Sequence, residues 1–67
     1  MPKIKLDKTD HKIIQILQRE GRITNNELAS RIGLTTTPTF ERVKRLEREG
    51  VITGYSALID RETVEMG

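Results

Sequence analysis

The stretch Thr24–Thr39, TNNELASRIGLTTTPT, decides how this chain folds. Its first four residues form a capping-box pattern, in which the Thr24 hydroxyl accepts from the N–H of the third residue after it and Glu27 reaches back. Three apolar residues follow at helical spacing: Leu28, Ala29 and Ile32. Gly33 then permits a sharp turn that a Cβ would hinder. The stretch therefore predicts a short helix over 24–32 that ends in a tight turn.

A longer helix is predicted immediately downstream, over residues 35–49. Thr35 is a candidate N-cap, and Pro38 lies in the first turn, where a missing N–H costs nothing. Three apolar residues recur on one side and are expected to seal the core: Phe40, Val43 and Leu46. Charged residues occupy most of the remaining positions, and Gly50 ends the helix.

An amphipathic helix is also predicted upstream, over residues 6–20. Asp7 suits the N-cap, and Asp10 stands where a capping-box acid would be. Gly21 fits the left-handed position that follows a helix. Four apolar residues share one stripe: Ile13, Ile14, Ile16 and Leu17. Three residues of the second helix and its turn are expected to face this stripe: Leu28, Ile32 and Leu34.

The tail is predicted to be extended. Residues 51–59 are rich in apolar and β-branched side chains and indicate a strand with a break at Gly54. From Asp60 onward the chain is polar and is expected to fray. The predicted fold class is therefore mainly α, with three helices and a C-terminal β-strand.

The composition narrows the classes of function. Of the 67 residues, 34% are hydrophobic and 3% aromatic, which is too few for a roomy pocket or a buried catalytic cleft. The chain has no cysteine and a single histidine, His11, so we expect no metal site and no cofactor. No apolar run approaches the ~20 residues of a membrane span, and a cytoplasmic location is expected. The net charge of +2 permits nucleic-acid binding without requiring it.

The second and third predicted helices together form a helix-turn-helix pattern. Ala29 is small enough to let the two helices cross closely. In this motif the N-terminal end of the later helix meets base edges in the major groove of double-stranded DNA. Threonine hydroxyls bond phosphates or bases, and threonine methyls contact thymine methyls. Four threonines at that end are candidate DNA contacts: Thr35, Thr36, Thr37 and Thr39.

Basic residues further along the same helix are the other candidates. Arg42 and Arg45 are suited to guanine O6 and N7, and the helical period puts Arg45 most directly opposite the buried face. Lys44 and Arg48 are better placed for phosphates, which position a domain without reading sequence. Glu41 lies on the same side, where it could accept from a cytosine amine or orient a neighbouring arginine, and we favour the second role. A solvated amphipathic helix would carry the same charges, so the capped short helix and the turn are what favour DNA.

Four ordered stretches carry a resemblance to one family: 6–10, 14–23, 27–34 and 35–59. Spanning nearly the whole chain, they resemble the N-terminal domain of the leucine-responsive regulatory protein / asparagine regulator (Lrp/AsnC) family of transcription factors. The resemblance implies a winged-helix-like three-helix domain that binds DNA as a dimer or higher oligomer. It also implies that the third helix is the recognition helix. Five positions fall where the family contacts DNA: Thr36, Thr37, Thr39, Arg42 and Arg45.

The chain departs from the family pattern in two ways. Where members commonly carry Ser-Pro after the Gly-Leu turn, it has Thr35-Thr36, which keeps the cap but bears on base preference. Members usually continue into a second α/β domain that binds amino acids and assembles the oligomer. We therefore divide the chain into a helix-turn-helix domain, 1–54, and a connecting strand or linker, 55–67. The chain is either a fragment of a longer protein or a stand-alone module. We expect a homodimer or higher oligomer, and an amino-acid effector, only for a full-length protein. For this chain we expect a monomer or a weak dimer.

A second class of function is a small protein-interaction module that dimerises through the 51–59 strand, because exposed strand edges pair with other chains. The N-terminal arm, the first helix and this strand would supply the dimer contacts. DNA binding differs from this alternative in its steep dependence on salt. An enzyme is the least favoured class, because capping explains Asp7 and Asp10 and there is no nucleophile–base pair.

Overall fold

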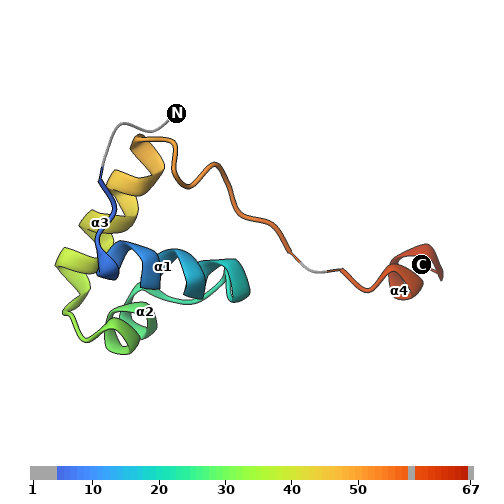
Figure 1. The fold of residues 1–67 in the computed structure, drawn as a ribbon. Helices are drawn as coiled ribbons and strands as arrows, with labels where there is room; N and C mark the ends of the chain where they lie inside the picture. Colours follow the sequence, from blue (N-terminus) through green and yellow to red (C-terminus); the bar gives the residue numbers. More distant parts are fainter. Residues whose placement is uncertain (1–4, 58, 67) are drawn as a thin grey trace.

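The computed structural model describes residues 5–57 and 59–66. Four helices follow in chain order within these residues: α1 (Lys8–Arg19), α2 (Asn25–Ile32), α3 (Thr36–Arg48) and α4 (Arg61–Met66). Figure 1 shows α1, α2 and α3 gathered into one bundle, with α4 standing apart at the end of an extended segment. The three predicted helices are confirmed, and their bounds agree with the predicted ones to within a turn. None of the described helices is long and apolar enough to span a bilayer.

The starts of α1 and α2 follow the predicted caps. In α1 the backbone N–H of Asp10 donates to Asp7 Oδ1 at 2.8 Å, and the N–H of Asp7 donates to Asp10 Oδ2 at 3.2 Å, so the capping box is complete. In α2 the N–H of Glu27 donates to Thr24 Oγ1 at 3.1 Å. The return bond from Glu27 does not form, because its carboxylate instead accepts from Arg31 Nε at 3.4 Å.

The start of α3 corrects one prediction. Thr35 has the extended backbone of an N-cap residue, but its side chain accepts no capping hydrogen bond. The reason is local: the third helical residue is Pro38, and this position normally supplies the N–H that a capping side chain accepts. The backbone oxygen of Thr35 is nevertheless used, because the Thr39 hydroxyl donates to it at 2.9 Å.

Glycine conformation matters after α2. Gly33 has φ 77° and closes α2 in the left-handed region, so a side chain there would be strained. The turn is completed by the Leu34 N–H, which donates to Ala29 O at 3.0 Å. The same conformation was predicted for Gly21 and is wrong, since among the described glycines only Gly33 and Gly50 have positive φ. Instead α1 ends at Arg19 and Glu20 is its C-cap, whose N–H donates to Ile16 O at 2.8 Å.

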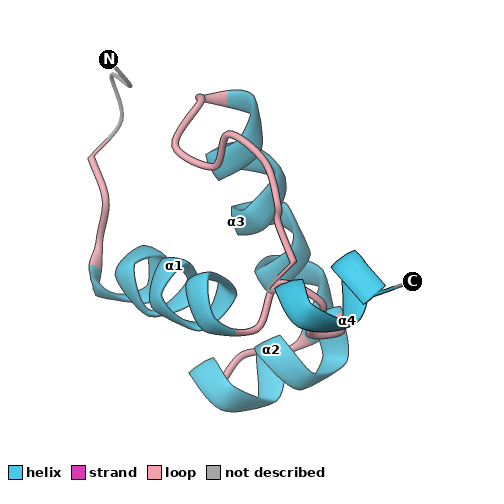
Figure 2. Cartoon of the chain, turned by 90° about the vertical axis from the view of Figure 1, so that its right-hand side faces the viewer, coloured by secondary structure: helices cyan, strands magenta, loops and turns pink. Residues whose placement is uncertain are grey.

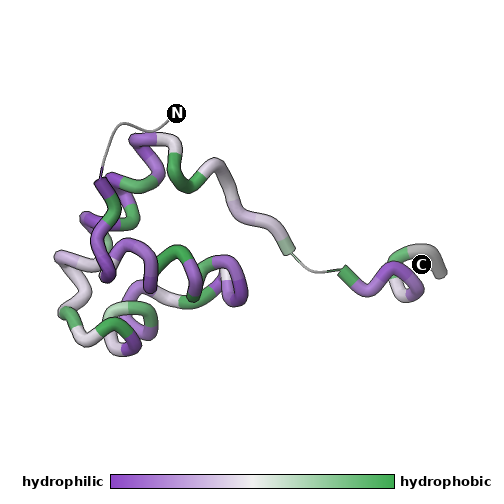
Figure 3. Tube along the Cα trace, viewed as in Figure 1, coloured by the Kyte–Doolittle hydropathy of each residue, from purple (hydrophilic) through white to green (hydrophobic). Residues whose placement is uncertain are grey.

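The core lies where the three helices meet. Its buried apolar side chains are Ile13, Leu28, Ala29, Val43 and Leu46. Partly buried apolar residues pack around them: Leu6, Ile14, Ile16, Leu17, Ile23, Ile32, Val51 and Ile52. Apolar and polar residues alternate along α1 and α3 accordingly (Figure 3).

The predicted facing of α3 and of the turn before it is wrong at two residues. Phe40 and Leu34 are 41% and 36% exposed, although both were predicted to face the core. Thr39 is fully buried in the place expected for Phe40. The buried face of α3 is therefore residues 39, 43 and 46, a spacing of four and three, and not 40, 43 and 46. Burial of Thr39 costs little because its hydroxyl is hydrogen-bonded to a backbone carbonyl.

The predicted C-terminal strand is absent from the described residues, as the lack of any arrow in Figure 2 shows. Residues 53–57 are irregular and exposed, and Leu58 lies outside the described residues. A β-branched composition favours a strand only when another strand is there to pair with it. Residues 61–66, predicted to fray, form α4 after Asp60, whose carboxylate accepts from the Glu62 N–H at 3.1 Å and the Thr63 hydroxyl at 2.8 Å. The Thr63 hydroxyl bond is the main cause of a lowered Asp60 pKa.

Candidate nucleic-acid interface

Two polar contacts fix how α2 sits between its neighbours. The Thr36 hydroxyl donates to Asn26 Oδ1 at 2.6 Å, which ties the first turn of α3 to the first turn of α2. Arg31 at the end of α2 pairs with Glu20 at the end of α1. This pair lowers the pKa of Glu20 and raises that of Arg31. The tight turn at Gly33 then directs α3 across α2, so the first turn of α3 is held at the surface.

The four candidate threonines divide into two groups. Thr35, Thr36 and Thr37 are exposed at the start of α3, as a DNA contact requires. The hydroxyl proton of Thr36 is committed to Asn26, which leaves its oxygen lone pairs and methyl free. Thr39 is fully buried, so the structure offers no surface on this side chain for DNA.

Arg42 is held by two carboxylates at the start of α1. Its Nη1 lies 2.9 Å from both carboxylate oxygens of Asp7 and 3.1 Å from Asp10 Oδ1. The Asp10 side chain is 4% exposed and that of Arg42 is 32% exposed, so the pair is partly shielded from solvent. The Asp10 N–H and then the Arg42 guanidinium lower the pKa of Asp7, and the Asp7 carboxylate in turn raises that of Arg42. Arg42 therefore joins α3 to α1 and does not present a free guanidinium to a guanine.

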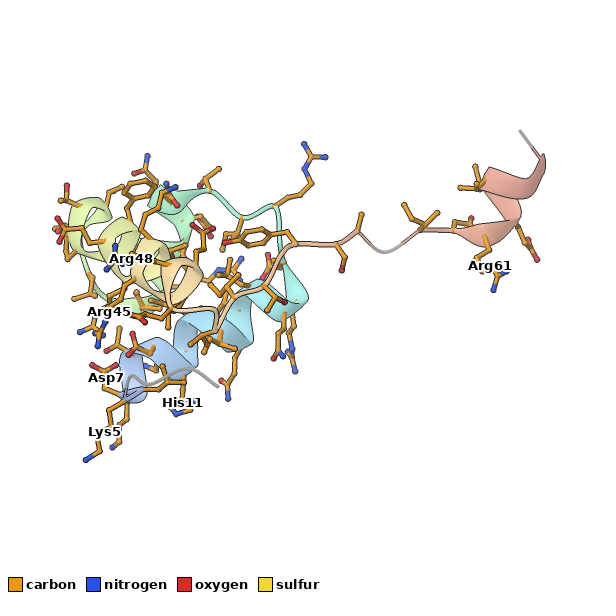
Figure 4. The ribbon with its side chains drawn as sticks, turned by 90° about the horizontal axis from the view of Figure 1, so that it is seen from above. Lys5, Asp7, His11, Arg45, Arg48 and Arg61 are labelled. Carbon is orange, nitrogen blue, oxygen red and sulfur yellow. The ribbon has the colours of Figure 1, made fainter. Side chains whose placement is uncertain are left out.

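Arg45 and Arg48 lie in a different environment on the same helix. Both are exposed, and no carboxylate within the described residues forms an ion pair with either. Figure 4 shows Arg45 extending away from the three helices. The expectation that Glu41 orients a neighbouring arginine is wrong, because no ion pair to Glu41 is found in the described part of the chain.

Lys44 has two neighbours on α3. Its Nζ lies 3.7 Å from Glu47 Oε1, and it also lies 5.3 Å from the centre of the Phe40 ring. Both distances are loose, and the Lys44 side chain is 57% exposed, so its ammonium remains available to a phosphate.

Sequence reasoning missed three residues of this region. Asn26 was treated only as part of a capping motif, and Phe40 was placed in the core. Tyr55 was treated as part of the predicted strand, but its hydroxyl donates to Glu47 Oε2 at 2.8 Å. Partial burial of the hydroxyl, followed by the nearby Glu47 carboxylate, raises the pKa of Tyr55 to about 12. The sequence held no signal for these contacts, because each depends on the rotation of α3 or on the path of the tail.

Comparison with known proteins agrees with this geometry. Residues 6–53 match a family model described as winged helix-turn-helix DNA-binding. The leucine-responsive regulatory protein of Escherichia coli is 54% identical over 55 residues, which make up 82% of this chain and 34% of that protein.

Solved structures show the same likeness. A transcriptional regulator of Neisseria meningitidis, solved as its L-methionine complex, superimposes with a TM-score of 0.87 at 48% identity, over 94% of this chain and 41% of that one. An AsnC family transcriptional regulator from Agrobacterium tumefaciens superimposes with a TM-score of 0.82 at 39% identity, over 88% of this chain and 39% of that one. The chain thus spans well under half the length of the relatives it matches.

Proposed function

We propose that α3 of this chain enters the major groove and selects the DNA sequence. The chain belongs to the winged helix-turn-helix DNA-binding family, and it matches the N-terminal domain of Lrp/AsnC transcription regulators. Proteins of this family are regulators and not enzymes. The exposed threonines Thr35, Thr36 and Thr37 face the base edges, while Arg45 contacts a guanine. Lys44 and Arg48 contact phosphates and position the domain.

The observation that carries this proposal is the uneven pairing of the α3 arginines. Arg42 is neutralised by Asp7 and Asp10, whereas Arg45 and Arg48 are exposed without a carboxylate partner in the described residues. The unpaired positive charge of α3 is thereby concentrated on the side away from the core. A polyanion approaching that side gains charge-assisted hydrogen bonds without breaking ion pairs within the domain.

The test is selection from a pool of genomic DNA fragments at several salt concentrations, using the wild-type chain, Arg45→Ala and Arg19→Ala. Arg19 is an exposed arginine on α1 and provides the matched loss of charge. The wild type should enrich a subset of fragments, and Arg45→Ala should lower that enrichment about 10- to 100-fold while keeping weak, salt-sensitive binding. Arg19→Ala should enrich as the wild type does. Equal enrichment by all three proteins, or affinity that does not fall with salt, contradicts the proposal.

A second proposal concerns assembly. The described part of the segment predicted as a strand, 51–57 and 59, contains no strand in a single copy of the chain, and residues 53–57 are exposed. Backbone groups exposed in this way support pairing with a second copy through residues 51–59. Sedimentation over a wide concentration range should show a monomer giving way to a weak dimer, and Ser56→Pro, which removes a backbone N–H, should weaken it. A strict monomer at every concentration contradicts this proposal.

Regulation by a small molecule is a proposal for a longer protein only. The Neisseria meningitidis relative was solved with L-methionine, and this chain covers 41% of it. We therefore propose an amino-acid effector and a homodimer or higher oligomer for a protein that carries the remaining length of the relatives. We assign no effector site to residues 1–67.

A further inference from the structure

Two adjacent residues of α3 are buried in the opposite order to the one that their hydrophobicity predicts. Thr39 is fully buried, and the much more apolar Phe40 beside it is 41% exposed. A rotation of α3 by one residue position would place the ring inside and the threonine outside. The helix nevertheless buries the threonine, whose hydroxyl donates to Thr35 O at 2.9 Å. Exposure of the ring forgoes favourable burial of a large apolar surface.

The position of Phe40 on α3 suggests a function for its exposed surface. A single exposed apolar residue is ordinary on a protein surface. Phe40, however, is the fifth residue of α3, one turn after the exposed Thr36 and Thr37. Residues in this part of a recognition helix are the ones that meet base edges. Positions where a local rule is broken in an otherwise consistent sequence are expected to be functional sites.

We propose that Phe40 is a specificity-determining residue that contacts the 5-methyl group of a thymine in the major groove. This inference rests on the proposed function, since it requires α3 to lie in that groove. The thymine methyl is the apolar group that natural base pairs present there, and phenylalanine is among the side chains that suit it. The contact buries both groups from water, which recovers the burial that the free domain forgoes.

Lys44 completes the arrangement. Its Nζ lies 5.3 Å from the centre of the Phe40 ring, one helical turn further along α3. A cation over an aromatic face is weakly attracted to it and restricts where the ring lies. The ammonium is still exposed and reaches outward, so a phosphate beside the same base pair is its natural partner. Phe40 therefore reads a base while Lys44 contacts the adjacent backbone.

The experiment changes the DNA before the protein. A duplex selected by the wild-type chain is synthesised with each thymine in turn replaced by deoxyuridine, which removes the 5-methyl group and keeps base pairing. At one position the wild type should lose about fourfold in affinity, the value expected for burial of one methyl-sized group. Phe40→Ala should bind the thymine and deoxyuridine duplexes equally at that position. Phe40→Leu, which keeps an apolar side chain, should retain part of the discrimination.

The controls separate this inference from the proposed function. Thr37→Ser removes a neighbouring methyl and keeps the hydroxyl, and it should preserve the discrimination at the Phe40 position. The Phe40 ring is only partly exposed, so the unfolding midpoint of each Phe40 variant is measured and affinities are compared at a temperature where all of the proteins are folded. If Phe40→Ala keeps the fourfold ratio, or if no deoxyuridine lowers wild-type affinity, Phe40 does not read a methyl while DNA binding stands. If the chain selects no duplex at all, the proposed function fails and this inference fails with it.

Discussion

Arg42 and Arg45 belong to the same helix and have different surroundings. The Arg42 guanidinium lies within 3.1 Å of carboxylate oxygens from Asp7 and Asp10, whereas Arg45 is exposed with no carboxylate partner in the described residues. The availability of a basic residue on α3 therefore depends on the carboxylates around it. One arginine determines where the helix lies, and the other is available to a ligand.

The largest expected effect is on folding stability, from the same substitution at the two arginines. Arg42→Ala leaves the buried Asp10 carboxylate without its cation, and we expect a loss of about 1–3 kcal/mol in the free energy of unfolding. Arg45→Ala removes an exposed side chain, and its effect should lie within about 0.5 kcal/mol. Urea unfolding followed by circular dichroism measures both. Both substitutions change the intrinsic helix propensity by the same amount. Equal losses of unfolding free energy would therefore show that the Asp7–Asp10–Arg42 cluster contributes nothing to stability.

A smaller effect is expected in acid. The pKa of Asp7 is below its ordinary value of 3.8, so its contribution to stability is present above pH 3.8 and is lost as the pH falls through the folded-state pKa. Asp7→Asn keeps an N-cap acceptor but loses the charge opposite Arg42. The variant should therefore lose less stability than the wild type between ~pH 5 and ~pH 2. Glu41→Gln, which removes an exposed carboxylate, is the matched control and should behave like the wild type. Parallel curves for wild type and Asp7→Asn would argue against the ion pair.

The smallest expected effect is a shift in the titration of Tyr55, near the other end of α3. There the neutral Tyr55 hydroxyl is hydrogen-bonded to the charged Glu47 carboxylate, whereas the Asp7–Asp10–Arg42 cluster joins charged groups. The pKa of Tyr55 is raised from 10.0 to about 12, so the stability that this contact provides is present below pH 10.0 and is lost as the pH rises through about 12. Tyr55 is the only tyrosine of the sequence, which makes the tyrosinate absorbance unambiguous. Glu47→Gln should lower the midpoint toward 10.0, and the urea-unfolded chain should titrate there. An unchanged midpoint in Glu47→Gln would exclude the carboxylate as a cause.

The parts of the fold that were predictable depend on neighbours in the sequence. The capping box of Asp7 and Asp10, the cap at Thr24 and the turn at Gly33 all involve residues within one turn of each other. Helical spacing of apolar residues likewise gave the three helices. Local patterns of this kind depend on backbone geometry and are readable from sequence.

The parts that were not predictable depend on packing between distant segments. Spacing alone could not distinguish a buried Phe40 from a buried Thr39, because both fit an apolar face that includes Val43 and Leu46. The partners of Arg42 lie more than 30 residues earlier in the chain, where the sequence gives no sign of them. The strand at 51–59 was expected from composition, and a strand requires a second strand, which the described residues of one copy do not supply. Sequence spacing therefore did not show that Thr39 is buried or that Arg42 is bonded to Asp7 and Asp10, and the DNA contacts stay predictions.

The long sequence separation of the Arg42 contact has a consequence for the order in which the domain assembles. The Thr36–Asn26 and Arg31–Glu20 contacts join residues 10 and 11 apart, whereas Arg42 meets Asp7 across 35 residues. Closing the longer loop costs about 1 kcal/mol more chain entropy than closing either short one. We therefore expect the helix pairs α1–α2 and α2–α3 to form early and the Arg42 cluster to form last. Final positioning of α3 would then be the slow, late step of an otherwise local folding process.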